Sequence, residues 1–238
     1  MKKWSKEYLD DILVRLAHHS SALEGNTITL AETISIILHN QVSSNRSLDL
    51  REVYEIKNHE QAFRYVLEAL KNNEPPQLHT VKEIHFLLMD RLQYDRGQFK
   101  SVENAIVGAD FMTASVQETP MLMQQWVDNL NYRLDTATDS KEKLSIIAEA
   151  HIAFERIHPF ADGNGRTGRI VMNYSLMQHD FEPLIINSQD KASYLRLLSE
   201  QDVVHFTQFI EKMLAEEQER LCRFQNKENQ QIPPETTE

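Results

Sequence analysis

The residues of this sequence that could do chemistry gather in one segment, which reads His-Pro-Phe-Ala-Asp-Gly-Asn-Gly-Arg-Thr-Gly-Arg over residues 158–169. Half of the six glycines in the chain fall within this segment. It joins two predicted helices, so its residues from Gly163 onward lie at a helix N-terminus. Unpaired backbone N–H groups point outward there, and the helix dipole favours an anion. Glycines at 163 and 165 would let phosphate oxygens approach the backbone closely. The segment therefore predicts an anion site.

Four side chains of the same segment could complete such a site. Arg166 and Arg169 carry guanidinium groups, which are planar partners for phosphate. Asp162 offers a hard oxygen ligand for a divalent ion that also touches phosphates. His158 could accept a proton near neutral pH. Each of these residues alone has an ordinary structural explanation, and no Gly-Lys-Ser/Thr of a Walker loop follows. Together they indicate phosphoryl or nucleotidyl transfer.

Composition limits the other functional classes. The 238 residues are 41% hydrophobic and 26% charged, typical of a globular domain with a sizeable core. The formal charge of −11 argues against nucleic acid or an anionic membrane as a partner. No apolar run approaches the ~18 residues of a membrane helix, and the first residues lack the apolar core of a signal peptide. The single cysteine, Cys222, excludes an internal disulfide, and we expect a cytoplasmic location.

Helical periodicity dominates the elements that must position the segment. One predicted helix runs toward residues 20–24 and stops at Gly25. Another occupies residues 48–70, a third runs from a cap at Asp139 to about residue 157, and a fourth follows the glycine segment to about residue 178. Between these helices we see no internal repeat and no long linker. The sequence therefore predicts one mostly helical domain.

Two segments differ from this helical pattern. Residues 94–115 place apolar and glycine residues without helical spacing, and we interpret them as a small β-hairpin or extended flap. Residues 226–238 are polar and contain two consecutive prolines, which predicts a disordered tail. The fold class is thus all-α with a small β-hairpin flap.

Residues 158–169 match, without a departure, the Fic motif His-Pro-Phe-x-(Asp/Glu)-Gly-Asn-Gly-Arg-x-x-Arg. The chain resembles the Fic family from about residue 20 to residue 209. This resemblance implies a helical Fic/Doc-type fold with a core domain over 29–225. It also implies transfer of AMP from ATP to a protein hydroxyl, because most family members with this motif catalyse that reaction.

The resemblance assigns roles to individual residues. His158 would take the proton from a target Ser, Thr or Tyr hydroxyl, Phe160 would anchor the loop, and Asp162 would hold Mg²⁺, with Mn²⁺ as an alternative. Tyr194 stands where family members often place a tyrosine by the adenine, although a core tyrosine is an equal alternative. The expected nucleotide-binding residues are Gly163, Asn164, Gly165, Arg166, Thr167, Gly168 and Arg169 in the loop and Val107, Gly108 and Ala109 in the flap.

A second motif lies N-terminal to the core, within residues 1–28. Ser20-Ser21-Ala22-Leu23-Glu24-Gly25 matches the inhibitory motif Ser/Thr-x-x-x-Glu-Gly/Asn of the family. The resemblance therefore places this chain in the class with an N-terminal inhibitory helix. A salt bridge from Glu24 to Arg169 would occupy the site that the γ-phosphate needs. The tethered Glu24 competes at an effective concentration of roughly millimolar order.

The predicted function is an autoinhibited protein adenylyltransferase, a nucleotidyltransferase of the EC 2.7.7 type. Its predicted partners are ATP and an unidentified target protein, with modification of itself and a homodimer left open. The enzyme alternatives are removal of AMP, alone or beside its transfer, and transfer of another nucleotide. A helical module that binds nucleotide without catalysis is the alternative from a different class.

Overall fold

The computed structural model describes residues 4–42, 44–106 and 111–231. These residues form helices α1 (Lys6–Leu23), α2 (Leu30–Leu38), α3 (Leu50–Lys71), α4 (Leu78–Leu88), α5 (Thr119–Thr136), α6 (Ser140–Ile157), α7 (Asn164–Gln178), α8 (Lys191–Ser199) and α9 (Val203–Gln231), with a 3₁₀ turn at Ser188–Asp190 before α8. The predicted fold class is confirmed for its helical content. In the described part of the chain every helix is too short or too polar to cross a bilayer.

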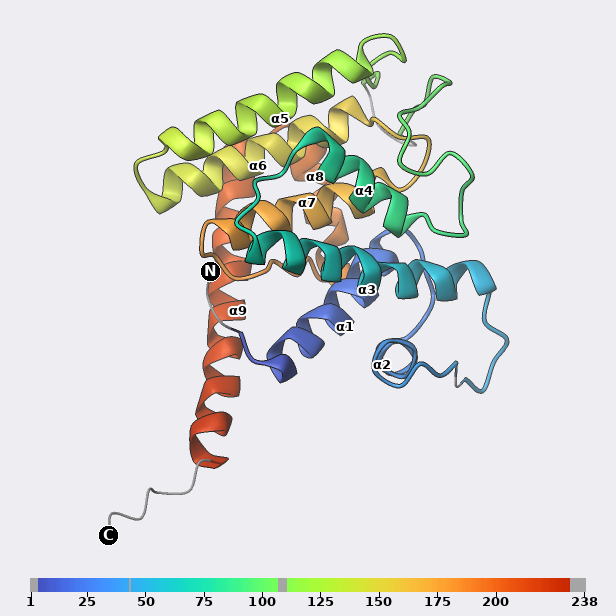
Figure 1. The fold of residues 1–238 in the computed structure, drawn as a ribbon, viewed down its shortest axis with the longest axis vertical. Coiled ribbons are helices and arrows are strands. Elements are labelled where there is room, and N and C mark those ends of the chain that lie inside the picture. The colour runs from blue at the N-terminus through green and yellow to red at the C-terminus, as the bar shows by residue number, and fades with distance from the viewer. Residues whose placement is uncertain (1–3, 43, 107–110, 232–238) are drawn as a thin grey trace.

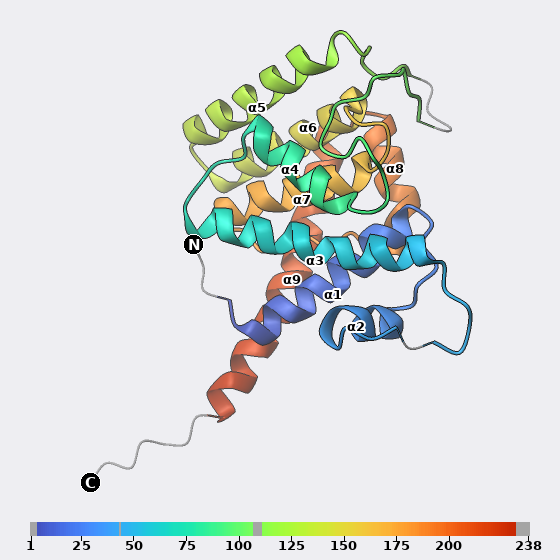
Figure 2. The same ribbon diagram turned by 45° about the vertical axis from the view of Figure 1, so that its right-hand side comes forward.

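Helix α7 lies in the middle of the molecule, and nearly all of its residues are buried. Helices α3, α4 and α6 pack around it, and α5 packs on α6 (Figure 1). The view in Figure 2 shows the same arrangement, with α9 running past the body so that its last turns extend beyond the other helices. The residues that begin α7 are therefore held by several helices at once.

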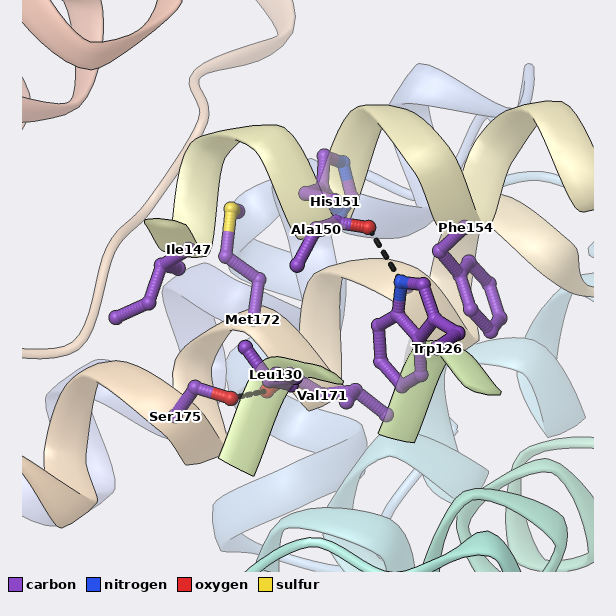
Figure 3. Close-up of a pocket in the computed structure, with 10 residues that line it drawn as sticks. Trp126, Leu130, Ile147, Ala150, His151, Phe154, Val171, Met172 and Ser175 are labelled. Atoms are coloured by element: carbon purple, nitrogen blue, oxygen red, sulfur yellow. Dashed lines mark hydrogen bonds between the residues drawn. The ribbon is translucent and has the colours of Figure 1, made fainter. Parts of the chain in front are cut away.

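The contact of α5 with α6 and α7 is largely apolar where it is buried, and a tryptophan side chain also makes a polar contact there. The Trp126 indole Nε1 donates to the Ala150 carbonyl at 2.7 Å, and its ring lies 5.5 Å from that of Phe154 between centroids. Figure 3 shows the small pocket between these helices, which is lined mainly by apolar side chains. This packing fixes α6, whose C-terminal end leads into the glycine segment.

Helix α1 is tied to α9 by a polar network that is largely buried. The Tyr8 hydroxyl donates to Glu217 at 2.9 Å, and the Arg15 guanidinium donates to both oxygens of the same carboxylate at 2.7 and 2.8 Å. Asp11 accepts from Arg15 and from Arg220 at 2.8 Å each. Such bidentate pairs hold their partners in one geometry. The C-terminal end of α1, with Ser20 and Glu24, is thereby fixed against α7.

Two sequence predictions are corrected by the fold. Residues 94–106 and 111–115 contain turns and extended chain but no strand, because polar side chains of this segment bond to the glycine loop in place of a hairpin partner. The predicted disorder over 226–238 is wrong for residues 226–231, which continue α9. Their sequence contains Glu, Lys and Gln, which are good helix formers. Residues 232–238 lie outside the described residues.

Candidate active site

The glycine segment forms a tight loop between α6 and α7. His158 ends α6 in the left-handed conformation, with φ 50° and ψ 60°. Phe160 is fully buried, as predicted, and stacks on the His85 ring at 3.8 Å between centroids. The Asn164 side chain accepts from the Phe160 N–H and donates to the Phe160 carbonyl, each at 2.8 Å. Asn164 therefore closes the loop with its amide and can offer a ligand only its backbone N–H.

His158 is set up as a proton acceptor. Its Nδ1 lies 3.2 Å from the Glu155 carbonyl oxygen. Because a carbonyl only accepts, Nδ1 carries the hydrogen in the neutral ring, and the lone pair is on Nε2. Burial lowers the pKa of His158 below its usual 6.5, although the bond to Glu155 opposes this. At neutral pH the ring is therefore an uncharged base.

The start of α7 offers backbone donors. The N–H groups of Asn164, Gly165 and Arg166 have no carbonyl four residues back within the helix. The Thr167 N–H already donates to the Gly163 carbonyl at 3.0 Å. The Gly168 N–H likewise donates to a backbone carbonyl within α7. The free donors are thus fewer than the predicted nucleotide-binding set, which included Thr167 and Gly168.

Two glycines of the loop lie against the ends of neighbouring side chains. Gly163 has φ +76°, and a Cβ atom there would lie 2.6 Å from the Met89 sulfur. A Cβ atom at Gly165 would lie 2.3 Å from Oε1 of Glu24. Gly165 therefore leaves the space that the Glu24 carboxylate occupies. Gly168 instead faces α6, and its lack of a side chain lets α6 and α7 pack closely.

Arg166 is a buried guanidinium with spare hydrogen-bonding capacity. It lies 3.4 Å from Glu55 Oε1 and 3.6 Å from Asp162 Oδ1. Among the described residues its Nε and Nη1 atoms have no hydrogen-bond partner. A buried donor without a partner is costly, typically by about 1–3 kcal/mol. An anion at the start of α7 would satisfy these groups.

Asp162 is half-exposed at the edge of the loop. Its Oδ2 accepts from Arg51 on α3 at 2.8 Å, and its Oδ1 accepts from the Gly163 N–H at 2.6 Å. No cluster of three or more His, Cys, Asp or Glu residues suited to a metal is found in the described ranges. One accessible carboxylate fits a magnesium ion that takes its other ligands from phosphate oxygens and water.

The salt bridge predicted from the inhibitory motif is present. The Arg169 Nη2 lies 2.7 Å from Glu24 Oε1 and 2.8 Å from the Ser20 carbonyl, and its Nε donates to the Ser20 hydroxyl at 2.9 Å. Burial alone would raise the pKa of Glu24, but the charge and hydrogen bond of Arg169, together with the Arg166 charge, outweigh burial and lower it. Gly25 follows with φ +100° and ends the segment. The Nε and Nη2 atoms of Arg169 are thus occupied by Ser20 and Glu24.

Tyr194 is a core residue in this structure. It is fully buried, and its hydroxyl lies 2.7 Å from Nε2 of His151, which is buried beside it. Its ring also packs near Phe206. The alternative of a core tyrosine therefore describes Tyr194 better than a place beside an adenine. The predicted flap residues Val107, Gly108 and Ala109 lie outside the described residues.

Sequence reasoning missed several residues that hold this loop. The His85 Nδ1 accepts from the Gly97 N–H at 2.8 Å, so its Nε2 carries the hydrogen and donates to the Asp162 carbonyl at 3.0 Å. Burial lowers the pKa of His85 to about 4, which keeps this ring neutral. Arg51 was missed because it is 111 residues from Asp162 in the chain. A second set of missed residues, at the base of the flap segment, is described below.

Comparison with known proteins agrees with this geometry. The model of the Fic/DOC family matches residues 75–176, from just before α4 into α7. The protein named "Protein adenylyltransferase Fic" from Drosophila willistoni is 32% identical over 197 residues, which cover 81% of this chain and 38% of the relative. A relative of the same name from Drosophila grimshawi is 31% identical over the same length. The chain spans about two fifths of the length of these relatives.

Solved structures show the same fold. A Fic domain containing signaling protein from Bacteroides thetaiotaomicron superposes with a TM-score of 0.79 at 27% identity, covering 88% of this chain and 85% of that one. Fic-1 (residues 134–508) from C. elegans superposes with a TM-score of 0.75 at 21% identity, covering 97% of this chain and 68% of that one. This chain therefore contains a Fic/DOC domain over residues 75–176.

Proposed function

We propose that this chain is a protein adenylyltransferase that is inhibited by its own first helix. The proposal rests above all on one arrangement: an uncharged His158 beside free N–H donors and the buried Arg166, whose Nε and Nη1 atoms have no hydrogen-bond partner among the described residues. The relatives named protein adenylyltransferase support AMP as the transferred group. A module that only binds nucleotide would need no proton acceptor at this place.

The reaction follows from the placement of these groups. His158 Nε2 accepts the proton of a target hydroxyl, whose oxygen attacks the α-phosphorus of ATP. The bond from the α-phosphorus to the bridging oxygen breaks, and pyrophosphate leaves with that electron pair. The N-terminus of α7 and the Arg166 guanidinium stabilise the charge on the phosphates. Asp162 would hold Mg²⁺, or Mn²⁺, which neutralises negative charge on the phosphates when it is bound.

Inhibition follows from the contacts of Arg169. Its guanidinium donates to Ser20 and Glu24, so it cannot also hold the terminal phosphates of ATP. The Glu24 carboxylate also brings negative charge to the place where phosphates would lie, against Gly165. ATP would then bind weakly or with its α-phosphorus out of line with the target hydroxyl. Withdrawal of Glu24 frees the arginine.

Removal of AMP is a second candidate reaction, and Glu24 is the residue that favours it. The Glu24 side chain is 41% exposed although it is paired with Arg169. An ionised, accessible carboxylate beside the loop could orient a water molecule for attack on a phosphodiester. In that case the same residue would inhibit transfer and support hydrolysis.

Labelled ATP distinguishes these reactions. The Glu24→Gly variant is incubated with Mg²⁺ and ATP labelled at either the α- or the γ-phosphorus, alone and in lysate. AMP transfer predicts that protein is labelled only by ATP that carries the label at the α-phosphorus. The double variant with both Glu24→Gly and His158→Ala should give no label. Label from the γ position would instead establish phosphate transfer. Protein that already carries labelled AMP is then mixed with either the wild-type chain or the Glu24→Gly variant. Loss of the label with the wild-type chain but not with the variant would establish removal of AMP.

The pH dependence of transfer tests the assigned base. Only neutral His158 accepts a proton, and its pKa is lowered below 6.5 by burial. The rate of Glu24→Gly is therefore expected to be flat between about pH 7 and 8 and to fall about tenfold per pH unit once the pH is below this pKa. The measurement is the initial rate at saturating ATP and Mg²⁺. A midpoint above 6.5 would contradict the assignment of His158 as a buried base.

A further inference from the structure

Three residues at the base of the flap segment, Lys100, Asn104 and Thr113, form a buried polar group that we call the flap-base cluster. Lys100 is only 2% exposed. Its ammonium lies 2.7 Å from Asn104 Oδ1 and 3.3 Å from the Thr113 hydroxyl. The Thr113 hydroxyl in turn lies 2.8 Å from both the carbonyl and the amide oxygen of Asn104. The cluster is therefore internally bonded, with a buried positive charge at its centre.

The cluster reaches across to the catalytic loop and bonds to four successive carbonyl groups. The Lys100 ammonium donates to the Ile157 carbonyl at 3.3 Å, and the Lys100 backbone N–H donates to that of Pro159 at 2.9 Å. The Asn104 amide donates to the carbonyls of His158 at 3.1 Å and Phe160 at 2.8 Å. Every carbonyl from 157 to 160 is thus held by Lys100 or Asn104.

The orientation of the Asn104 amide is fixed by chemistry. An ammonium only donates, so the amide oxygen must face Lys100. The amide nitrogen then faces the loop, where both of its neighbours are carbonyl oxygens that only accept. The reverse orientation would leave both carbonyls without a donor from Asn104 and bring the NH₂ group against the ammonium. Lys100 therefore sets the direction in which Asn104 donates.

The loop needs such support because of its backbone. His158 is a non-glycine residue in the left-handed region, which costs of order 1–3 kcal/mol unless the surroundings hold it there. Left-handed backbone at 158 directs the ring so that Nδ1 meets the Glu155 carbonyl and Nε2 is left to accept a proton. The carbonyls on both sides of this strained residue are those that the cluster binds. The hydrogen bonds of the cluster therefore act on the backbone conformation that orients the His158 ring.

We propose that Lys100 and Asn104 are positioning residues that hold His158 in its catalytic conformation. The proposal rests on the proposed function, since it concerns the base of that reaction. Burial lowers the pKa of Lys100, whereas the Glu103 charge opposes this shift. The three oxygen acceptors around the ammonium, together with the C-terminal end of the α6 dipole, favour its charged form.

The test compares variants in the Glu24→Gly background, where transfer is measurable. Asn104→Leu removes both donors without adding charge, and we expect kcat to fall on the order of tenfold to a hundredfold. The KM for ATP should stay within about twofold, because the free nucleotide donors lie on α7. Thr113→Val is the matched control, since Thr113 belongs to the cluster but bonds to no loop carbonyl, and its kcat should change less than about threefold.

A second pair of variants guards against a folding defect at Asn104. Lys100→Met removes the charge at similar length and should lower kcat on the order of tenfold. Lys100→Arg keeps a cation with several donors and should restore most of that loss. Thermal unfolding of each variant shows which proteins are folded, and only those are compared.

Nitrogen-15 NMR of the histidine rings gives a readout apart from activity. The His158 signals are assigned by their loss in His158→Ala. In the parent protein, neutral His158 should carry its hydrogen on Nδ1, whereas folded Asn104→Leu and Lys100→Met should show a mixture of tautomers. Unchanged tautomers in both variants would overturn the proposal, even if kcat fell. If the variants change the tautomer but the Glu24→Gly parent has no transferase activity, the positioning role is supported and the proposed function is wrong.

Discussion

Glu24→Gly is expected to raise AMP transfer on the order of a hundredfold over the wild-type chain. A change of this size corresponds to about 2.8 kcal/mol, which matches the few kcal/mol needed to shift a two-state population. The reason is that Glu24 occupies Arg169: its carboxylate accepts at 2.7 Å from a guanidinium that is almost completely buried. Glycine at 24 deletes this acceptor and leaves α1 in place.

The measurement is the initial rate of label transfer from α-labelled ATP. Glu200→Gly is the matched control, because Glu200 caps α8 with a backbone similar to that of Glu24 but is exposed and remote from the loop. Ser20→Ala removes one of the side-chain acceptors of Arg169 and should give a smaller increase. If Glu24→Gly is folded and no more active than Glu200→Gly, inhibition by α1 is wrong.

His158→Ala in the Glu24→Gly background is expected to lose transfer by about 10²–10⁴-fold, the usual contribution of a general base. Alanine removes Nε2, and the nearby His85 cannot replace it, because His85 uses both of its ring nitrogens for backbone groups. Nucleotide affinity should change little, since the free donors belong to α7.

Calorimetric titration with a non-hydrolysable ATP analogue and Mg²⁺ separates binding from chemistry in this variant. His205→Ala serves as the control, because His205 is an exposed histidine on α9 that pairs only with Asp202 among the described residues. Its rate should equal that of the Glu24→Gly parent. Retention of more than about a tenth of the parental rate by His158→Ala would show that another group takes the proton.

Local interactions account for what could be read from the sequence. Asp139 caps α6 by accepting from the N–H three residues on, and the loop is closed by Asn164 bonding to Phe160 four residues back. Such contacts depend on neighbours in the chain, so residue type and spacing predict them. The pairing of Glu24 with Arg169 is long-range, and only the resemblance to a known motif made it predictable.

The flap segment shows where reasoning from the sequence failed. Its apolar residues and glycines lack helical spacing, which predicted a hairpin or an extended flap, but not that Lys100 and Asn104 direct their donors to carbonyls of the loop. A lysine among polar residues gives no sign that it will be buried. Its burial depends on the end of α6 arriving beside it, which is decided by the packing of distant helices.

The sequence by itself determined the helices and predicted an anion-binding turn at residues 163–166, because these follow from backbone preferences and side-chain chemistry within a few residues. The resemblance to the Fic motif added His158 as the expected base. Only the tertiary structure decided that Arg51 would pair with Asp162, that Tyr194 would be a core residue and that the flap would support the loop. Those contacts join residues 43–111 positions apart. They form only after the helices have packed, since packing and not local propensity brings such residues within hydrogen-bonding distance.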